Sequence, residues 1–554
     1  MSSPTSLKIA VRSYAVQIQN YTHKRKRKTS SASGKKRKGL PRPSDTTLVF
    51  DTETTTDHTQ RLRFGTYRVY KKTKFMENGI FYEPENVTPD ELQLLRTYTE
   101  KNDLVLRTRE EFARKVFYIY GYHHDGLILG FNLPFDLSRL ATKASTSCAS
   151  DMRGGFSLQL LPEKWLPNLL VKHLNSRSAF MRFASNERTL DSRSARKKRV
   201  KTETNYGYLQ DVKTLAAALL GRSFSLGALA DFLETERRKM GTDEHGGPLT
   251  PEYLDYAIND TLVTWECYVE LKKKYEEHGL SETPPHRIYS EASLGKAYLR
   301  QMNLRPWTKA QKNFPPDIIG TIMSTYYGGR SEVCIRREIT RILYCDFRSM
   351  YPTVCTLMGL WRYVIATGLK TDDWTKETCK LLDKVGLSDI RNPRFWRKLN
   401  VLIQVEPDDD ILPVRAPYLV PGRRTEPSRT IGLNYLTAEF SNWYTLADCI
   451  ASKVLTGRSP KVIRAIRFKP RGKQRGFKPI AIGGNDEYRI DPTTDDFYKR
   501  VIELRGEVQS AVARARAEGA NAERGAPGIV STDAQTACQL DQLRHLCRTQ
   551  CAVL

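Results

Sequence analysis

Two carboxylates, Asp51 and Glu53, follow directly on the apolar run 48–50. Alternate residues of a β-strand project from the same face, so both side chains are expected on one side of a strand end. Like charges at this spacing repel each other and raise each other's pKa unless a cation lies between them. An isolated pair of this kind is most often one solvated edge of a surface strand. With further carboxylates nearby, it indicates a divalent-metal site.

Two other acidic positions supply such carboxylates. Asp136 follows a second apolar run, and Asp260 lies on a predicted helix, four residues after Tyr256 and on the same helical face. Four carboxylates and one tyrosine suit phosphodiester hydrolysis with two metal ions, which clamp the attacking and leaving oxygens. Oxygen ligands favour Mg²⁺ or Mn²⁺. The Tyr256 hydroxyl would orient the attacking water, because a phenol is a weak general base at neutral pH.

Short apolar strands alternate with helices around these acidic residues. The sequence predicts strands at 48–50, 117–122 and 127–131 and helices at 215–220 and 226–233. This mixture is typical of an α/β (α+β) layered fold, in which helices cover the faces of a sheet.

Composition divides the chain into four parts. Residues 1–44 carry twelve Lys or Arg and no acid, and we expect a basic disordered tail. A Thr-Pro-Pro sequence near residue 283 separates a first domain at 45–282 from a second at 283–512. Residues 513–554 have a different, atypical composition. A further basic stretch at 193–201 is predicted to lie in a loop.

The charge balance indicates a nucleic acid as partner. Lys and Arg number 89 and Asp and Glu 62, which gives a net charge of +27. No apolar run is long enough for a membrane span, no signal peptide is recognisable, and no Cys-x-x-Cys pair indicates structural zinc. We therefore expect an intracellular protein, cytoplasmic or nucleoid-associated. It would be nuclear if the tail is an import signal rather than a solvated arm.

The ordered set Asp51-x-Glu53, Asn132-x-x-Phe135-Asp136 and Tyr256-x-x-x-Asp260 resembles the three exonuclease motifs of family B DNA polymerases. The resemblance implies a 3′→5′ proofreading exonuclease with an RNase H-like fold over residues 45–282. It also implies roles for single residues: metal binding by Asp51, Glu53, Asp136 and Asp260, water orientation by Tyr256, and contact of Asn132 and Phe135 with the DNA primer end.

Two elements of the second domain extend the resemblance. The sequence 326–329 looks like the Tyr-x-Gly-Gly element of this family, and 346–352, after a predicted strand at 341–346, is similar to polymerase motif A, with Met in place of the usual Leu. The resemblance implies that Asp346 binds the catalytic metals in a partial palm domain. It further implies template contact by Tyr326, Gly328 and Gly329 and nucleotide contact by Phe347, Ser349, Met350 and Tyr351.

Two polymerase elements are not found in the sequence. There is no Lys-x-x-x-Asn-Ser-x-Tyr-Gly segment and no Tyr-x-Asp-Thr-Asp segment, and the nearest acidic cluster, Asp491–Asp496, is predicted to cap a helix. Nucleotidyl transfer needs carboxylates from two adjoining strands. The sequences 443–448 and 453–457 resemble the palm segment of bacterial, plasmid and phage-like members of this family. The resemblance implies a DNA-directed DNA polymerase chain of that type. Its exonuclease would be complete, and it would use dNTPs only if the polymerase site is completed.

Three explanations of the missing motifs remain open: a truncation, a shifted reading frame, and a split enzyme whose other motifs lie on a second polymerase chain. From another class of function, the chain could be a non-catalytic DNA-binding remnant. The expected partners under the leading interpretation are primer-template DNA and a single-stranded 3′ end.

Overall fold

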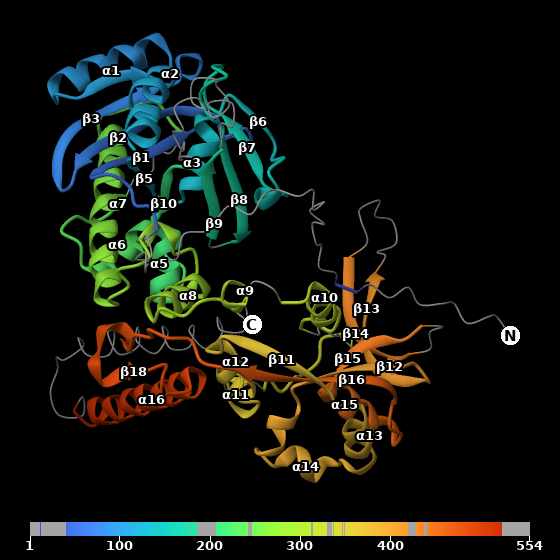
Figure 1. Ribbon diagram of the computed structural model, residues 1–554. Helices are drawn as coiled ribbons and strands as arrows, with labels where there is room; N and C mark the ends of the chain where they lie inside the picture. Colours follow the sequence, from blue (N-terminus) through green and yellow to red (C-terminus); the bar gives the residue numbers. More distant parts are fainter. Residues whose placement is uncertain are drawn as a thin grey trace, which may run out of the picture.

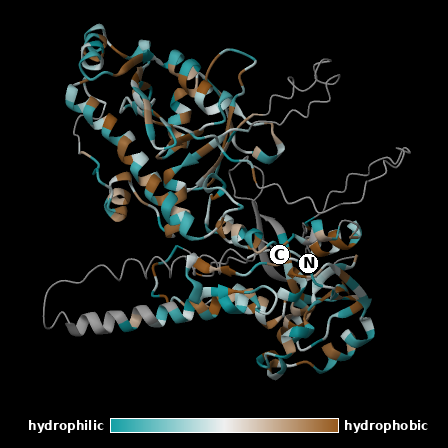
Figure 2. Cartoon of the chain, turned by 60° about the vertical axis from the view of Figure 1, so that its left-hand side comes forward, coloured by the Kyte–Doolittle hydropathy of each residue, from teal (hydrophilic) through white to brown (hydrophobic). Residues whose placement is uncertain are grey.

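The computed structural model describes residues 11–12, 40–176, 178–184, 206–241, 246–311, 314–329, 335, 337–345, 347, 349–418, 428–436 and 440–522. Most of the basic tail, the stretch 193–201, Asp346 and residues 523–554 lie outside the described residues. The chain has mixed α/β structure and forms two bodies, each built around its own sheet (Figure 1). Figure 2 shows apolar residues mainly on the inner sides of the helices and strands of both bodies.

A six-stranded mixed sheet is the centre of the first body. Its order is β10-β5-β1-β2-β3-β4. β1, β2 and β3 are successively antiparallel, β5 runs parallel to β1, β10 parallel to β5, and β4 parallel to β3. The strands are β1 (Thr46–Thr54), β2 (Leu62–Lys71), β3 (Lys74–Tyr82), β4 (Val105–Thr108), β5 (Leu127–Gly130) and β10 (Tyr208–Asp211).

Helices cover both faces of this sheet. Leu48 and Phe50 of β1 pack in one cluster with α3 (Leu133–Leu140) and a π-helical segment at Ala113–His123. Val49, between them, faces the opposite side and packs in the cluster that includes α7 (Pro251–Glu277). The other helices of this body are α1 (Pro89–Lys101), α2 (Arg109–Phe112), α5 (Val212–Leu220) and α6 (Leu226–Leu233).

The strand predicted at 117–122 is wrong. These residues lie within the helical segment Ala113–His123, where Phe117 and Tyr118 are buried against Phe183. A short apolar run has the same appearance in a buried helix and in a buried strand, and here packing between two sheets decides.

The second sheet of the first body has the order β6-β7-β8-β9, with strands β6 (Lys143–Thr146), β7 (Phe156–Gln159), β8 (Leu169–Asn175) and β9 (Ser178–Phe183).

The second body contains a four-stranded antiparallel sheet of order β11-β16-β12-β15 and a separate hairpin, β13-β14. Its strands are β11 (Gly368–Asp373), β12 (Val401–Glu406), β13 (Asp410–Tyr418), β14 (Ser428–Leu436), β15 (Asn442–Thr445), β16 (Lys461–Arg471), β17 (Ile480–Ala481) and β18 (Arg489–Ile490). Its helices are α9 (Trp307–Ala310), α10 (Pro316–Ser324), α11 (Met350–Leu357), α12 (Trp361–Val364), α13 (Thr375–Lys384), α14 (Leu387–Arg391), α15 (Leu446–Thr456) and α16 (Phe497–Ala522).

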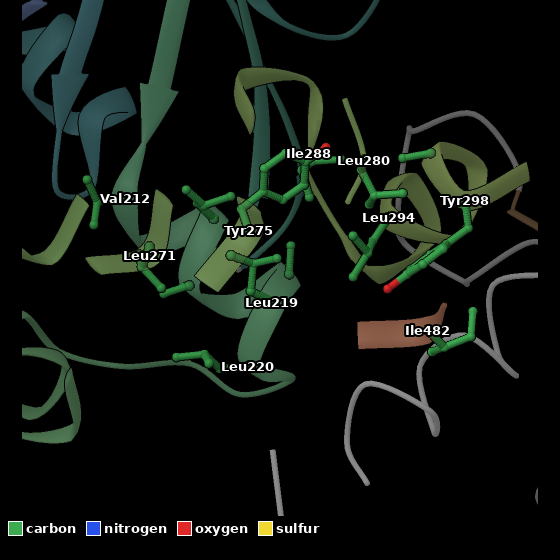
Figure 3. Packing of buried hydrophobic residues seen from close by; sticks show 14 of the residues in the cluster. Val212, Leu219, Leu220, Leu271, Tyr275, Leu280, Ile288, Leu294, Tyr298 and Ile482 are labelled. Carbon is green, nitrogen blue, oxygen red and sulfur yellow. The ribbon is translucent and has the colours of Figure 1, made fainter. Parts of the chain in front are cut away.

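One buried apolar cluster joins the two bodies. It extends from α5 and α7 through α8 (Glu291–Gln301) to Ile482 and the start of α16 (Figure 3). The Tyr298 hydroxyl, inside this cluster, accepts the backbone N–H of Gly483 at 2.8 Å and lies 2.5 Å from Nδ1 of His278. In the described part of the chain, no helix is both long and apolar enough to cross a membrane.

Candidate active site

The predicted alternation along β1 is confirmed. Asp51 and Glu53 continue the face of Val49, toward α7, whereas Thr52 lies on the face that packs against α3. β2 lies close to β1 here, as Gly65 shows: a Cβ atom added to this residue would be only 2.5 Å from the backbone oxygen of Asp51. The end of this strand can therefore bring together side chains from both sides of the sheet.

Asp136 comes from α3, which lies on the face of the sheet to which Thr52 points. Its Oδ1 accepts a hydrogen bond of 2.7 Å from the Thr52 hydroxyl. The start of α3 is fixed by Asp211, the last residue of β10, whose Oδ1 accepts the backbone N–H groups of Asn132 (2.8 Å) and Leu133 (3.2 Å). The same carboxylate caps α5 through Thr214. Asp211 thus holds the helix that carries Asp136 in register with the sheet.

The opposite face of the sheet is covered by α7, which carries Tyr256 and Asp260. Its predicted helical face is confirmed, and the helix is fixed to β2 by a hydrogen bond of 2.9 Å from the Thr66 hydroxyl to the carbonyl of Ala257. One turn before Tyr256, the hydroxyl of Tyr253 donates to Oε2 of Glu53 at 2.8 Å. The Tyr253 ring is fully buried and packs edge-on against Phe64. Its orientation, and with it the position of one Glu53 oxygen, is therefore fixed by packing.

A lysine joins the two predicted residues of α7. Nζ of Lys239 forms an ion pair with Oδ2 of Asp260 and donates to the Tyr256 hydroxyl at 2.7 Å. Lys239 lies in the loop after α6, which is held to α7 because the side-chain amide of Asn259 donates to the carbonyl of Arg238 at 2.9 Å. The Lys239 ammonium is thus a built-in counter-cation of the carboxylate cluster.

The electrostatics of the cluster reflect shared burial and mutual repulsion. Burial raises the pKa of Asp51 well above its usual value, and the neighbouring charges of Asp136, Glu53 and Asp260 raise it further, while Lys239 lowers it. Burial also raises the pKa of Glu53 to about 7, against the opposing effect of its hydrogen bond from Tyr253. The four carboxylates therefore influence one another as a single group.

The donor set fits a hard divalent cation in its chemistry. Burial raises the pKa of Asp136, and its Oδ2 atom is buried with no hydrogen-bond partner among the described residues. A cation would satisfy this oxygen and relieve the repulsion. Within the described ranges, however, no three Asp, Glu, His or Cys side chains are close enough to hold a metal ion without rearrangement. The ion pair between Lys239 and Asp260 is one contact that would have to loosen.

The predicted primer-contacting residues lie beside this cluster. Asn132 is exposed and has a left-handed backbone conformation with φ of 68°. Phe135 is half-buried beneath the guanidinium of Arg139, which lies 4.7 Å from the ring centre. Arg139 also donates to the carbonyl of Gln60 at 2.7 Å. This contact ties α3 to the loop that follows β1.

The Tyr-x-Gly-Gly element is anchored to the second body by a residue that the sequence did not single out. The Tyr327 ring is buried and stacks on Tyr444 of β15, and its carbonyl accepts a hydrogen bond from Arg415 of β13. Tyr326, one of the predicted template contacts, is exposed beneath the guanidinium of Arg12 at 4.2 Å. Gly328 has φ of 99°, a conformation that favours glycine, and Gly329 is exposed in open space.

The strand predicted before Asp346 is wrong as far as residues 341–345 are described. They are extended and exposed, and none of them belongs to a strand. An extended segment becomes a strand only by pairing with a neighbouring strand, and no described strand pairs with these residues. Asp346 itself lies outside the described residues.

The residues after Asp346 are held from α16. Ser349 is buried with φ of 52°, and its hydroxyl oxygen accepts a hydrogen bond of 2.6 Å from Arg505. Phe347, Met350 and Tyr351 are exposed, the last two at the start of α11.

The acidic cluster before α16 has the predicted capping role. Oδ1 of Asp496 accepts the backbone N–H groups of Tyr498 and Lys499, and Asp495 accepts the backbone N–H of Asp491 at 2.8 Å. These contacts use carboxylate oxygens that a metal would need. The cluster is therefore explained as a helix cap.

Sequence reasoning missed four residues of the site: Thr52, Asp211, Lys239 and Tyr253. Tyr253 could have been found, because it precedes Tyr256 by three residues and so lies on the same helical side. Lys239 carries no sequence signal, since it reaches the cluster from a loop about twenty residues before Asp260. No protein-family model matches the chain, and no curated protein is significantly similar to it.

Proposed function

We propose that the chain is a 3′→5′ DNA exonuclease of the family B DNA polymerase type, acting with Mg²⁺ or Mn²⁺ on a single-stranded primer end. The observation that carries the proposal is the convergence of the three acidic segments. They come from β1, α3 and α7, and they meet in one buried cluster at the end of the central strand. Separate surface carboxylates would not share burial in this way.

The topology of the first body supports an RNase H-like fold. Three antiparallel strands, β3, β2 and β1, continue into two strands parallel to β1, in the order β3-β2-β1-β5-β10. The additional edge strand β4 extends this arrangement. In this fold the expected site is the end of the central strand, where Asp51 and Glu53 lie.

The metals, when bound, would polarise the phosphodiester and lower the pKa of the attacking water. Asp51, Glu53, Asp136 and Asp260 would hold them. Thr52 and Tyr253 each fix one carboxylate oxygen and leave the other oxygen for a ligand. These contacts reduce the side-chain freedom that metal binding would otherwise have to remove.

Lys239 and Tyr256 would act on the substrate side. The Tyr256 hydroxyl accepts a hydrogen bond from the Lys239 ammonium, so its own proton is available to an acceptor such as Asp260 or a water oxygen. Burial and the nearby Asp260 raise the pKa of Tyr256, so it stays protonated and positions water rather than removing a proton from it.

The test is a gel assay on a 3′-mispaired primer with its template, in Mg²⁺, with and without dNTPs. Wild type is expected to shorten the primer, and Asp260→Asn to leave it intact while still binding it. Shortening by Asp260→Asn would remove the proposal. Extension in the presence of dNTPs would show that the polymerase site is complete in this chain.

A second candidate function is one half of a split DNA polymerase. The exposure of residues 341–345, directly before Asp346, favours it. A palm strand that delivers a catalytic carboxylate must be paired on both sides to be rigid. Under this proposal a second polymerase chain supplies the missing carboxylates and dNTPs become substrates. Extension only after that chain is added would support it.

A further inference from the structure

The chain before and after Asp346 exposes large apolar side chains over a short length. Leu343 is 91% exposed and Tyr344 85%, and Ile339, Ile342 and Phe347 are each at least 79% exposed. Single exposed apolar residues are ordinary on a soluble protein, but five within nine positions mark an interaction site. We call residues 337–345 together with Phe347 the docking segment.

The docking segment has the side-chain pattern of an interior β-strand. In an extended chain Ile339, Leu343 and Phe347 project to one face, and Ile342 and Tyr344 to the other. A strand that is apolar on both faces belongs inside a sheet, and its Ile, Tyr and Phe residues favour strand conformation. Among the described residues, however, no strand pairs with 337–345, and no backbone hydrogen bond holds 338–345.

The end of the docking segment is fixed in space. Ser349, two residues after Phe347, is held by Arg505 of α16, and α11 begins directly after it. The carbonyl of Phe347 accepts the backbone N–H of Met350 at 3.2 Å. A strand held at one end loses less conformational entropy on pairing than a free one, which favours docking.

The charge of this region indicates the chemistry of the partner. The docking segment contains two arginines and one acid, 2 − 1 = +1, in a chain of net charge +27. A second copy of the chain would bring the same excess and be repelled. Nucleic acid would match the charge but offers no apolar strand. An acidic strand with apolar residues matches both properties.

We propose that the docking segment binds a β-strand of a second polypeptide in which apolar residues alternate with Asp or Glu. Backbone hydrogen bonds would complete the strand ladder, and the apolar side chains would cover Leu343 and its neighbours. This inference goes beyond the proposed function, because docking requires no nuclease activity. If the split-enzyme explanation holds, it gives the second polymerase chain a place to bind.

The test is a selection from a displayed library of 14-residue peptides against the full-length chain, with Leu343→Pro as the counter-selected variant. Proline removes a backbone donor and breaks strand pairing, and Leu343 is solvent-exposed, so the variant is expected to fold and to keep wild-type primer shortening. The expected result is enrichment of extended peptides in which apolar residues alternate with acids, with at least tenfold weaker binding to Leu343→Pro.

Hydrogen exchange of the chain, measured with and without the most enriched peptide, locates the peptide-binding site. Amides 339–345 should slow on binding, and Leu343→Thr, which keeps strand propensity but loses apolar area, should bind more weakly than wild type and better than Leu343→Pro. Enrichment of basic peptides, equal binding to Leu343→Pro, or unchanged exchange at 339–345 would overturn the proposal. Self-association of the chain that Leu343→Pro abolishes would assign the segment to a second copy. Displacement of the peptide by single-stranded DNA would assign it to nucleic acid.

Discussion

The acidic cluster of Asp51, Glu53, Asp136 and Asp260 and the segment 341–345 that leads to Asp346 were both predicted from the sequence to serve a catalytic site, yet they differ in structure. In the first, Asp136 and Glu53 each have an oxygen fixed by a hydroxyl group from another part of the chain, and Lys239 supplies an opposing charge. In the second, residues 341–345 are exposed and pair with no strand of the described part of the chain.

The difference teaches what a motif requires beyond its own residues. Buried carboxylates repel one another, so they can be held together only where other elements provide hydrogen bonds and a counter-charge. The first body contains all of these elements. Among the described residues of the second body, no strand lies beside 341–345, so the local sequence alone does not define the geometry of a site.

The largest expected effect compares one carboxylate from each region. Asp136→Asn removes a proposed metal ligand and should lower primer shortening by at least about 10³-fold, on the order of 4 kcal/mol in the activation barrier. Asp346→Asn should leave the same activity within about twofold. Rates measured on a labelled single-stranded primer in Mg²⁺ test both. A comparable loss in the two variants would end the distinction between the regions.

A second prediction concerns the built-in cation of the first region. Lys239→Met leaves Asp260 without its ion pair and should lower the metal-free stability at pH 8 by about 2 kcal/mol, and less at pH 5. Mn²⁺ should recover more stability in this variant than in wild type, because it replaces the lost charge. Thermal melting measures both effects. Lys272→Met, on the exposed side of α7, is the matched control and should change little.

The third prediction is the pH dependence of the metal-free protein. The folded-state pKa of Glu53, about 7, lies above the unfolded value near 4.5. Between pH 4.5 and 7 the folded state therefore binds more protons than the unfolded state, and the free energy of unfolding falls as pH rises. Glu53→Gln should flatten the fall by on the order of 2 kcal/mol. Denaturant titrations with a chelator at several pH values measure it. Parallel curves for the two proteins would contradict the assignment.

The smallest effect is expected at Tyr253. Tyr253→Phe keeps the buried ring but removes one hydrogen bond to Glu53, which is worth about 1 kcal/mol. The Mn²⁺ concentration for half-maximal activity should rise about fivefold, with little change in the rate at saturating metal. Tyr98→Phe removes a hydroxyl that binds Asp255 elsewhere on α7 and serves as the control. Equal shifts in the two variants would show that only helix stability had changed.

Local pattern was sufficient to predict much of the first body. The alternation of Asp51 and Glu53, the helix at 226–233 and the shared side of Tyr256 and Asp260 all follow from the periods of strand and helix, and all are confirmed. These features depend on neighbours in sequence. The roles proposed for the residues stay predictions.

The features that could not be predicted depend on distant partners. Residues 117–122 have strand-like composition but form a helix because two sheets enclose them. The run 341–345 has strand-like composition but lacks a described partner strand. Lys239 meets Asp260 only because the loop after α6 folds back on α7. None of these contacts leaves a periodic trace in the sequence.

The apolar cluster between the two bodies determines which truncations the first body can tolerate. A stop codon near position 282 would remove Tyr298 and Ile482 and leave Leu219 and Tyr275 facing water. The first body would then expose a contiguous apolar surface and aggregate. A shortened chain that keeps the first body soluble would therefore also have to keep α8 and the 480–504 segment, which cover this apolar surface.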